Sequence, residues 1–265
     1  MRKLYLFIYL FSYLPIFPNN PPPNNAIALS LGGASAAHHS PFSIEYNSAN
    51  LVWSPSQFGF NAQNRFGIGD YSSLFVVNSF KLDKAALGLS FLMDQGELIT
   101  YKTQVAFAKK IEENISVGIA LNHLLFKSIN PYYKKKHTVT FNLGVSYIAN
   151  PKMEVGFQIS NPTQSQLIQY PNESIPTNTR LGICYSITPN IKAYLDGIQS
   201  TNEPLNGCIG IEIYREEYTV RGGFNFNQVV GLGLTFKKKS IHFDIGLGIH
   251  NVLGLSPSIN GRHAW

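Results

Sequence analysis

The fold is decided by the stretch Ile241-His242-Phe243-Asp244-Ile245-Gly246-Leu247-Gly248-Ile249-His250. Its odd-numbered positions are all aliphatic or aromatic, whereas its even-numbered positions are glycine, histidine or aspartate. Successive side chains of a β-strand point to opposite faces, so this period of two predicts a strand with one apolar and one polar face. An α-helix, which turns by about 100° per residue, would mix the two sets on every side.

The same alternation returns in residues 115–121, 139–147, 153–159 and 230–236. Turn signals divide the chain after residue 53 into roughly fourteen predicted strands: 54–64, 70–82, 84–95, 97–109, 113–126, 134–148, 150–160, 177–187, 190–199, 205–215, 217–227, 228–238, 240–250 and 255–265. Each has roughly 10–15 residues, against the 9–11 that a tilted strand needs to cross a bilayer and the 5–6 of an ordinary soluble strand. The lengths therefore favour membrane-crossing strands.

The composition agrees with a membrane sheet. Charged residues make up 14% of the chain and hydrophobic residues 44%, whereas soluble domains carry about 25% charged residues. Lipid cannot satisfy the free backbone groups of a sheet edge, so the sheet must close on itself. We predict an all-β fold, a transmembrane antiparallel β-barrel of about 14 strands over residues 54–265, located in the bacterial outer membrane.

The predicted connections alternate in length, as they do in outer-membrane barrels with short periplasmic turns and longer outer loops. Tight turns are expected at 81–83, 150–151 and 188–190, and longer connections at 64–70 and 161–178. The alternation is incomplete, because some connections of the longer set are also tight. It places both ends of the barrel in the periplasm.

Residues 1–28 have the features of a cleaved signal peptide. A basic head, Met1-Arg2-Lys3, precedes an apolar run at 4–17, and Ala26-Ile27-Ala28 has the small-x-small pattern of a cleavage site. The alternative is a membrane anchor, but a run of about 14 residues is short of the roughly 20 that a spanning helix needs, and Pro15 interrupts it. The remaining chain has 19 Lys and Arg against 15 Asp and Glu, a weak net charge of +4 that does not indicate nucleic-acid binding.

Residues 29–53 show no clean alternation and predict a separate N-terminal segment. It can lie in the lumen as a plug or in the periplasm as a tail, and its many small residues favour close packing inside the barrel. The residues that we expect to form the plug are Gly32, Gly33, Tyr46, Asn47 and Asn50.

Charged residues on the polar faces of the strands are expected to point into the lumen. They are Glu154, Arg180, Glu212, Arg221, Asp244 and Arg262. Because acids and bases are mixed, and an unpaired buried charge is costly, ion pairing across the lumen is favoured over an open polar pore lining. Lys134-Lys135-Lys136, at the start of a strand, can meet lipopolysaccharide phosphates or form a solvated loop.

No residue pattern points to catalysis, a cofactor or a metal. The histidines lack the spacing of metal ligands, and no nucleophile motif is present. Cys184 and Cys208 fall on the eighth and tenth predicted strands, so about two strand spacings separate them, too far for a disulfide, and we predict free thiols. The terminal Trp265 shares the outward parity of its strand and is predicted to lie in the aromatic girdle at the membrane interface.

Several motifs resemble one family of barrels. Leu31-Gly32-Gly33-Ala34 followed by Ser43–Leu51 is similar to the "GGA … NPAGL" segment that opens the long-chain fatty-acid transporter superfamily of outer-membrane barrels. Val252–Pro257 is similar to its closing "VLGFSPQ" hairpin, while Ser48 stands where the family usually has Pro. The resemblance is strongest to the barrel subunits (PorV- and PorQ-type) of the type IX secretion system of the Bacteroidota, and it implies fourteen strands and an outer-membrane location.

Three functions follow from these expectations. We favour a non-enzymatic accessory or structural subunit of an outer-membrane protein secretion or assembly machine, because the chain leaves little mass outside the barrel for a deep ligand pocket. The alternatives are a passive channel for small hydrophobic compounds and a lipid-modifying barrel enzyme. The expected partners are outer-membrane lipid, lipopolysaccharide and a further outer-membrane or periplasmic protein.

Overall fold

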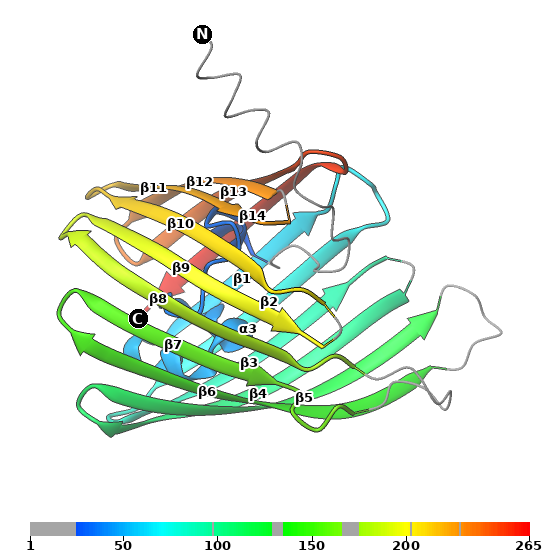
Figure 1. Ribbon diagram of the computed structural model, residues 1–265, viewed down its shortest axis with the longest axis horizontal. Coiled ribbons are helices and arrows are strands. Elements are labelled where there is room, and N and C mark those ends of the chain that lie inside the picture. The colour runs from blue at the N-terminus through cyan, green and yellow to red at the C-terminus, as the bar shows by residue number, and fades with distance from the viewer. Residues whose placement is uncertain (1–24, 97, 129–134, 166–174, 202, 228) are drawn as a thin grey trace, which may run out of the picture.

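A computed structural model describes residues 25–96, 98–128, 135–165, 175–201, 203–227 and 229–265. Fourteen antiparallel strands form one closed barrel in which each strand pairs with its neighbours in sequence and β1 pairs with β14 (Figure 1). The strands are β1 Gln57–Asn64, β2 Ser72–Lys81, β3 Ala85–Asp94, β4 Leu98–Glu112, β5 Ile115–Ser128, β6 Lys136–Asn150, β7 Met153–Ser160, β8 Asn178–Thr188, β9 Ile191–Ser200, β10 Asn206–Tyr214, β11 Tyr218–Asn225, β12 Val229–Lys238, β13 Ile241–His250 and β14 Gly254–Ala264.

Each predicted strand corresponds to one observed strand, with ends that differ by up to three residues. The barrel was predicted to begin at residue 54, whereas β1 begins at Gln57. The fold is the transmembrane antiparallel β-barrel that the alternation predicts, and every backbone edge is paired because the barrel is closed. The connections at one end of the barrel are tight, and those at the other end include residues 65–71 and 161–177. We call these ends the short-turn end and the long-loop end; β1 begins and β14 finishes at the short-turn end.

The two faces of each strand divide as the sequence predicts. On β13, Ile241 is 59% exposed on the outer surface of the barrel, whereas Asp244 is fully buried in the lumen. Most of the exposed large hydrophobic side chains of the chain lie at such outward strand positions, among them Phe58, Leu89, Phe107, Ile119, Leu143, Leu195, Leu232 and Phe243. The outer wall is therefore an apolar belt suited to acyl chains.

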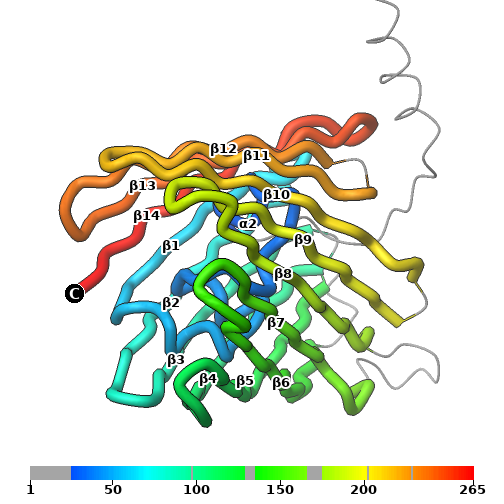
Figure 2. The backbone as a smooth tube through the Cα atoms, turned by 60° about the vertical axis from the view of Figure 1, so that its left-hand side comes forward, coloured from blue at the N-terminus to red at the C-terminus, as the bar shows by residue number. Residues whose placement is uncertain are grey.

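The N-terminal segment lies inside the barrel, not beside it (Figure 2). It contains three short helices: α2 Ala26–Ser30, α3 Ser43–Tyr46 and the 3-10 helix η1 Ser48–Trp53. Helix α2 contacts β11 to β14, and η1 contacts β2 to β6, so the segment spans the lumen from one side to the other. No helix among the described residues is long and apolar enough to cross a membrane.

Residues 25–54 are called the plug below. Their aliphatic side chains, including Leu31, Ile44 and Leu51, form one buried cluster with Phe75, Val77 and small wall residues such as Ala106. The described part of the plug starts at Asn25, inside the predicted signal peptide, and the side chain of Asn25 caps α2 by accepting the Ala28 N–H. The described lumen segment is thus four residues longer at its start than the predicted 29–53 segment.

Candidate functional site

The plug is held by two asparagines that the sequence singled out. Asn47 donates from Nδ2 to the carbonyl oxygens of Ala36 within the plug, at 3.0 Å, and of Val145 on β6, at 2.9 Å. Asn50 donates from Nδ2 to Ala36 and His38, at 2.8 and 3.2 Å. Ala36 and His38 lie in an earlier part of the plug, and Val145 lies in the barrel wall. The side-chain amides of Asn47 and Asn50 therefore join two parts of the plug to each other and fasten the plug to the barrel.

A charged clamp holds the middle of the plug. One carboxylate oxygen of Asp196 on β9 accepts the backbone N–H groups of Ser35 and Ala36 at 2.8 and 2.9 Å. The same oxygen lies 3.0 Å from a guanidinium nitrogen of Arg180, which also donates to the Gly33 carbonyl at 2.7 Å. Hydrogen bonds with a charged partner are the stronger kind, so Arg180 and Asp196 fix the plug turn to β8 and β9.

Glycines allow the plug backbone to turn and to approach the wall. Gly32 and Gly33 have φ values of +65° and +98°, in the left-handed region that glycine adopts most readily. A Cβ atom at Gly223 of β11 would collide with the backbone of Leu31 and Gly32. The next residue, Gly222, faces outward, and a Cβ there would meet nothing within 4 Å.

Four of the other predicted lumen charges pair with one another, in line with the ion-pair interpretation. Arg221 Nε lies 2.6 Å from Glu212 Oε1, and Arg262 Nε lies 2.8 Å from Asp244 Oδ2. Arg221 also lies 3.6 Å from Asp244, which joins the two pairs into one network across β10, β11, β13 and β14. These ion pairs stiffen the barrel wall and occupy the lumen beside it. They do not form a row of free charges along an open pore.

Two histidines of the plug contact carboxylates of the wall, and one of these carboxylates, Glu212, belongs to this network. His39 Nε2 lies 2.9 Å from Glu154 Oε2 on β7, which accounts for the last of the predicted lumen charges. His38 is buried, lies 3.7 Å from Glu212, and packs against the ring of Tyr194. Burial lowers the pKa of His38 below its ordinary value, and this effect exceeds the opposing influence of Glu212.

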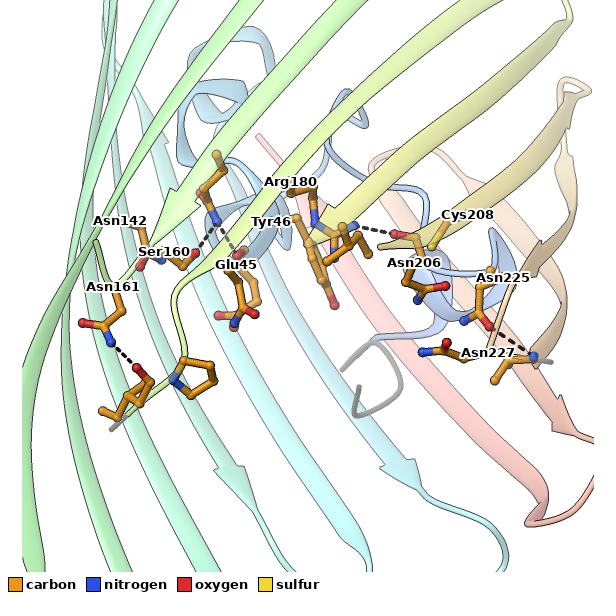
Figure 3. A pocket seen from close by; sticks show the side chains of 18 of the residues that line it. Glu45, Tyr46, Asn142, Ser160, Asn161, Arg180, Asn206, Cys208, Asn225 and Asn227 are labelled. Carbon is orange, nitrogen blue, oxygen red and sulfur yellow. Dashed lines mark hydrogen bonds between the residues drawn. The ribbon is translucent and has the colours of Figure 1, made fainter. Parts of the chain in front are cut away.

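A cavity of about 360 Å³ lies between the plug and the long-loop end (Figure 3). Gly32, Gly33, Glu45 and Tyr46 of the plug form its inner end. Polar wall residues surround it: Lys102, Asn122, Thr140, Asn142, Gln158, Ser160, Asn161, Asn178, Arg180, Asn206, Asn225, Asn227 and His250. The cavity is open toward the long loops, where its lining residues Val252 and Leu253 are 62% and 47% exposed.

The sequence alone does not single out this asparagine-rich wall. Asn206 and Asn225 occupy inward positions at the long-loop ends of β10 and β11, whereas Asn122 and Asn142 occupy inward positions in the middle of β5 and β6. The alternation of polar and apolar residues along each strand already assigns these asparagines to the lumen face. Their gathering depends on the register of the strands, for example Asn122 opposite Thr140, which the sequence does not specify.

The other predicted positions are placed as follows. Trp265 is exposed at the short-turn end, where its ring stacks with His263 and meets Phe80 edge-on, with centroids 5.9 and 6.3 Å apart. Its place in a membrane-interface girdle stays a prediction.

Cys184 and Cys208 are buried free thiols on β8 and β10, with β9 between them. Lys134 lies outside the described residues, so the Lys134–Lys136 cluster is not described as a whole.

The described residues offer no metal centre. No group of three or more His, Cys, Asp and Glu side chains among them is arranged to hold an ion. The predicted lumen charges contact other charged side chains and the plug backbone, and polar side chains line the outer cavity.

Comparison with known proteins gives a match by structure alone. No protein-family model matches the sequence, and no curated protein matches it significantly. The structure is similar to the crystal structure of the P. putida toluene transporter TodX, with a TM-score of 0.74 and 10% identity over 91% of this chain and 98% of that one. It is also similar to a Pseudomonas aeruginosa FadL homologue, with a TM-score of 0.62 and 10% identity over 91% of this chain and 97% of that one. The chain thus has the FadL-type barrel fold.

Proposed function

We propose that this chain is a non-enzymatic outer-membrane channel that admits small organic molecules from the cell exterior, with the plug as its gate. One observation carries the proposal: a cavity of about 360 Å³, open at the long-loop end, is closed at its inner end by a plug anchored in the lumen. That volume lies within the usual range of small-molecule sites. The similar barrels that are described as a toluene transporter and a hydrocarbon channel support transport over an accessory role in secretion.

The cavity supports the following order of events. A molecule enters between the long loops and contacts Tyr46 of the plug and Arg180 of β8. Residues 25–54 fill the lumen beyond that point, so passage requires the plug to shift. The plug is fastened to the wall by apolar packing and by hydrogen bonds, including those of Asn47 and Asp196, and both kinds of contact can be exchanged for other partners without breaking a covalent bond.

The predicted accessory role in a secretion or assembly machine, specifically a type IX machine, stays a prediction. The expected contacts with lipopolysaccharide and with an outer-membrane or periplasmic protein partner also stay predictions. Isolation of the protein in a mild detergent, followed by mass spectrometry of the proteins and lipids that accompany it, tests all three. A stoichiometric protein partner would favour the accessory role.

Transport is tested with purified protein in liposomes. We expect radiolabelled toluene or an alkyl glucoside to enter these vesicles faster than protein-free vesicles, and faster still when residues 29–50 are deleted. Asn227→Trp, at the rim of the cavity, is expected to slow entry, whereas Asn150→Trp, exposed at the short-turn end, is not. Entry at the protein-free rate through both the intact chain and the deletion variant would overturn the proposal.

A further inference from the structure

The cavity has two chemically different sides. Asn122, Thr140, Asn142, Gln158 and Ser160 line it from β5, β6 and β7, three neighbouring strands. Phe66, Val229, Val252 and Leu253 line it from β12 and from the loops that join β1 to β2 and β13 to β14. In a closed ring of fourteen strands, β6 and β13 are seven places apart and therefore opposite each other. An amide wall thus faces a wall that carries these four apolar residues beside Asn225, Asn227 and His250, and we call it the apolar wall.

The apolar side is held in place by His250. Its Nδ1 accepts the backbone N–H groups of both Val252 and Leu253, each at 3.1 Å. The ring of Phe66 meets the ring of His250 edge-on, with centroids 6.0 Å apart. The apolar residues are therefore fixed at the cavity mouth.

Two places in the polar lining have hydrogen-bonding capacity to spare, namely Asn122 on the amide wall and Asn206 at the start of β10. Among the described residues, the side-chain oxygens of Asn122 and Asn206 are buried without a hydrogen-bond partner. These side chains are only 2% and 4% exposed, and both line the cavity. Asn122 is oriented by its Nδ2, which donates to Thr140 and Asn142 at 3.1 and 3.0 Å. Leaving a buried acceptor unpaired costs about 1–3 kcal/mol, so a ligand that donates hydrogen bonds here is favoured.

The charges in the lining are already neutralised. Lys102 Nζ lies 2.8 Å from a carboxylate oxygen of Glu45, and Arg180 is paired with Asp196 below the cavity floor. The guanidinium carbon of Arg180 also lies 5.3 Å from the centre of the Tyr46 ring. Because these cations and anions balance, the site has no net attraction for a charged ligand.

We infer that the cavity binds a neutral amphipathic molecule whose hydroxyl-bearing end contacts the amide wall and whose hydrocarbon end contacts the apolar wall. A short alkyl glycoside has this chemistry, whereas an unsubstituted hydrocarbon leaves the oxygens of Asn122 and Asn206 unpaired. The inference rests on the proposed function, since it specifies which small organic molecules the channel receives.

Binding to purified protein in lipid nanodiscs tests the inference without any transport step. The probes are hexyl glucoside, toluene, hexanoate and glucose, each titrated by calorimetry with empty nanodiscs as the blank. We expect hexyl glucoside to bind at least about tenfold more tightly than the other three. Tighter or equal binding of toluene or hexanoate would overturn the inference.

Asn206→Leu keeps the approximate side-chain volume and removes the unpaired oxygen. We expect it to weaken hexyl glucoside binding about five- to twentyfold and to leave toluene binding unchanged or stronger. The matched control is Gln63→Leu. Gln63 is another buried amide without a hydrogen-bond partner among the described residues, and it does not line the cavity. Equal effects of the two variants would contradict the inference, and heat-dependent gel mobility confirms that both are folded.

The two proposals can fail separately. If the protein binds hexyl glucoside but no transport into liposomes is measured, only the proposed function is refuted. If transport is measured but hexyl glucoside does not bind, only this inference is refuted.

Discussion

One carboxylate oxygen of Asp196 accepts the backbone N–H of Ser35 at 2.8 Å, which ties the middle of the plug directly to the barrel wall. The contact matters because the same oxygen serves the N–H of Ala36 and the guanidinium of Arg180. A single wall residue therefore organises two backbone donors and one cation, and its replacement is expected to loosen all three together.

Asp196→Asn tests that clamp. The amide retains one acceptor but loses the negative charge opposite the partly buried Arg180, and breaking a buried pair costs about 3 kcal/mol or more. We expect a lower unfolding temperature and a larger liposome conductance. Asp83→Asn, at an exposed turn, is the control and is expected to change neither quantity. Equal conductance of the Asp196 variant and the unmodified protein would show that this carboxylate does not hold the plug closed.

Gly223→Val should displace the plug from β11, because a Cβ at this position collides with the backbone of Leu31 and Gly32. We expect increased conductance and easier proteolysis of the plug in proteoliposomes. The adjacent Gly222→Val adds the same side chain on the outer face, where no atom lies within 4 Å, and should behave like the unmodified protein. If both variants conduct alike, close backbone contact at Gly223 is not what seats the plug.

The barrel could be predicted from the sequence because lipid on one side of the wall and a packed lumen on the other enforce alternation. Ile241 and Asp244, for example, lie on opposite faces, as their spacing requires. The same alternation assigned Glu212 and Arg221 to the lumen, but their pairing depends on strand register, in which they lie directly opposite each other.

The cavity could not be predicted in the same way. Its polar wall arises where Asn142 is opposite Ser160 and Asn122 is opposite Thr140, pairs that are 18 residues apart in each case and brought together by hairpin register. The sequence leaves two positions for the plug, the lumen and the periplasm, and its small residues, such as Gly32, favour the lumen without specifying which wall residues it contacts. Its seating depends on contacts as distant in sequence as Ala26 with Asn260.

The N-terminus of the mature chain is expected at or before Asn25. The Ala26 N–H donates to Asn260 Oδ1 at 3.0 Å, and Asn25 Nδ2 donates to the hydroxyl of Tyr46 at 3.0 Å. Cleavage after Ala28, as the small-x-small pattern predicts, would remove these anchors together with most of α2. Intact-mass measurement of the protein purified from membranes decides between the two sites, and a mature chain that starts at Leu29 would exclude the longer plug.

Acidification is expected to destabilise the plug through His38. Burial lowers the pKa of His38 from its ordinary value of 6.5, despite the neighbouring Glu212. Below pH 6.5 the His38 side chain therefore takes up a proton in the unfolded chain, whereas in the folded chain it stays neutral until a lower pH. The stability that the neutral ring confers is complete above pH 6.5 and is lost as the pH falls toward the lower folded pKa, by at most about 1.4 kcal/mol per pH unit.

The measurement is the unfolding temperature between pH 8 and pH 5, with conductance recorded in parallel. His38→Gln keeps a hydrogen-bonding side chain near Glu212 but cannot take up a proton, so its unfolding temperature should fall less between pH 7 and pH 5 than that of the unmodified protein. Other groups facing His38, namely Glu212, Arg221, His39 and Tyr194, are unchanged in this variant. His263→Gln, an exposed histidine on β14, serves as the control and should retain the full acid sensitivity. If His38→Gln and His263→Gln follow the same pH profile, the acid response originates elsewhere, and His38 contributes packing alone.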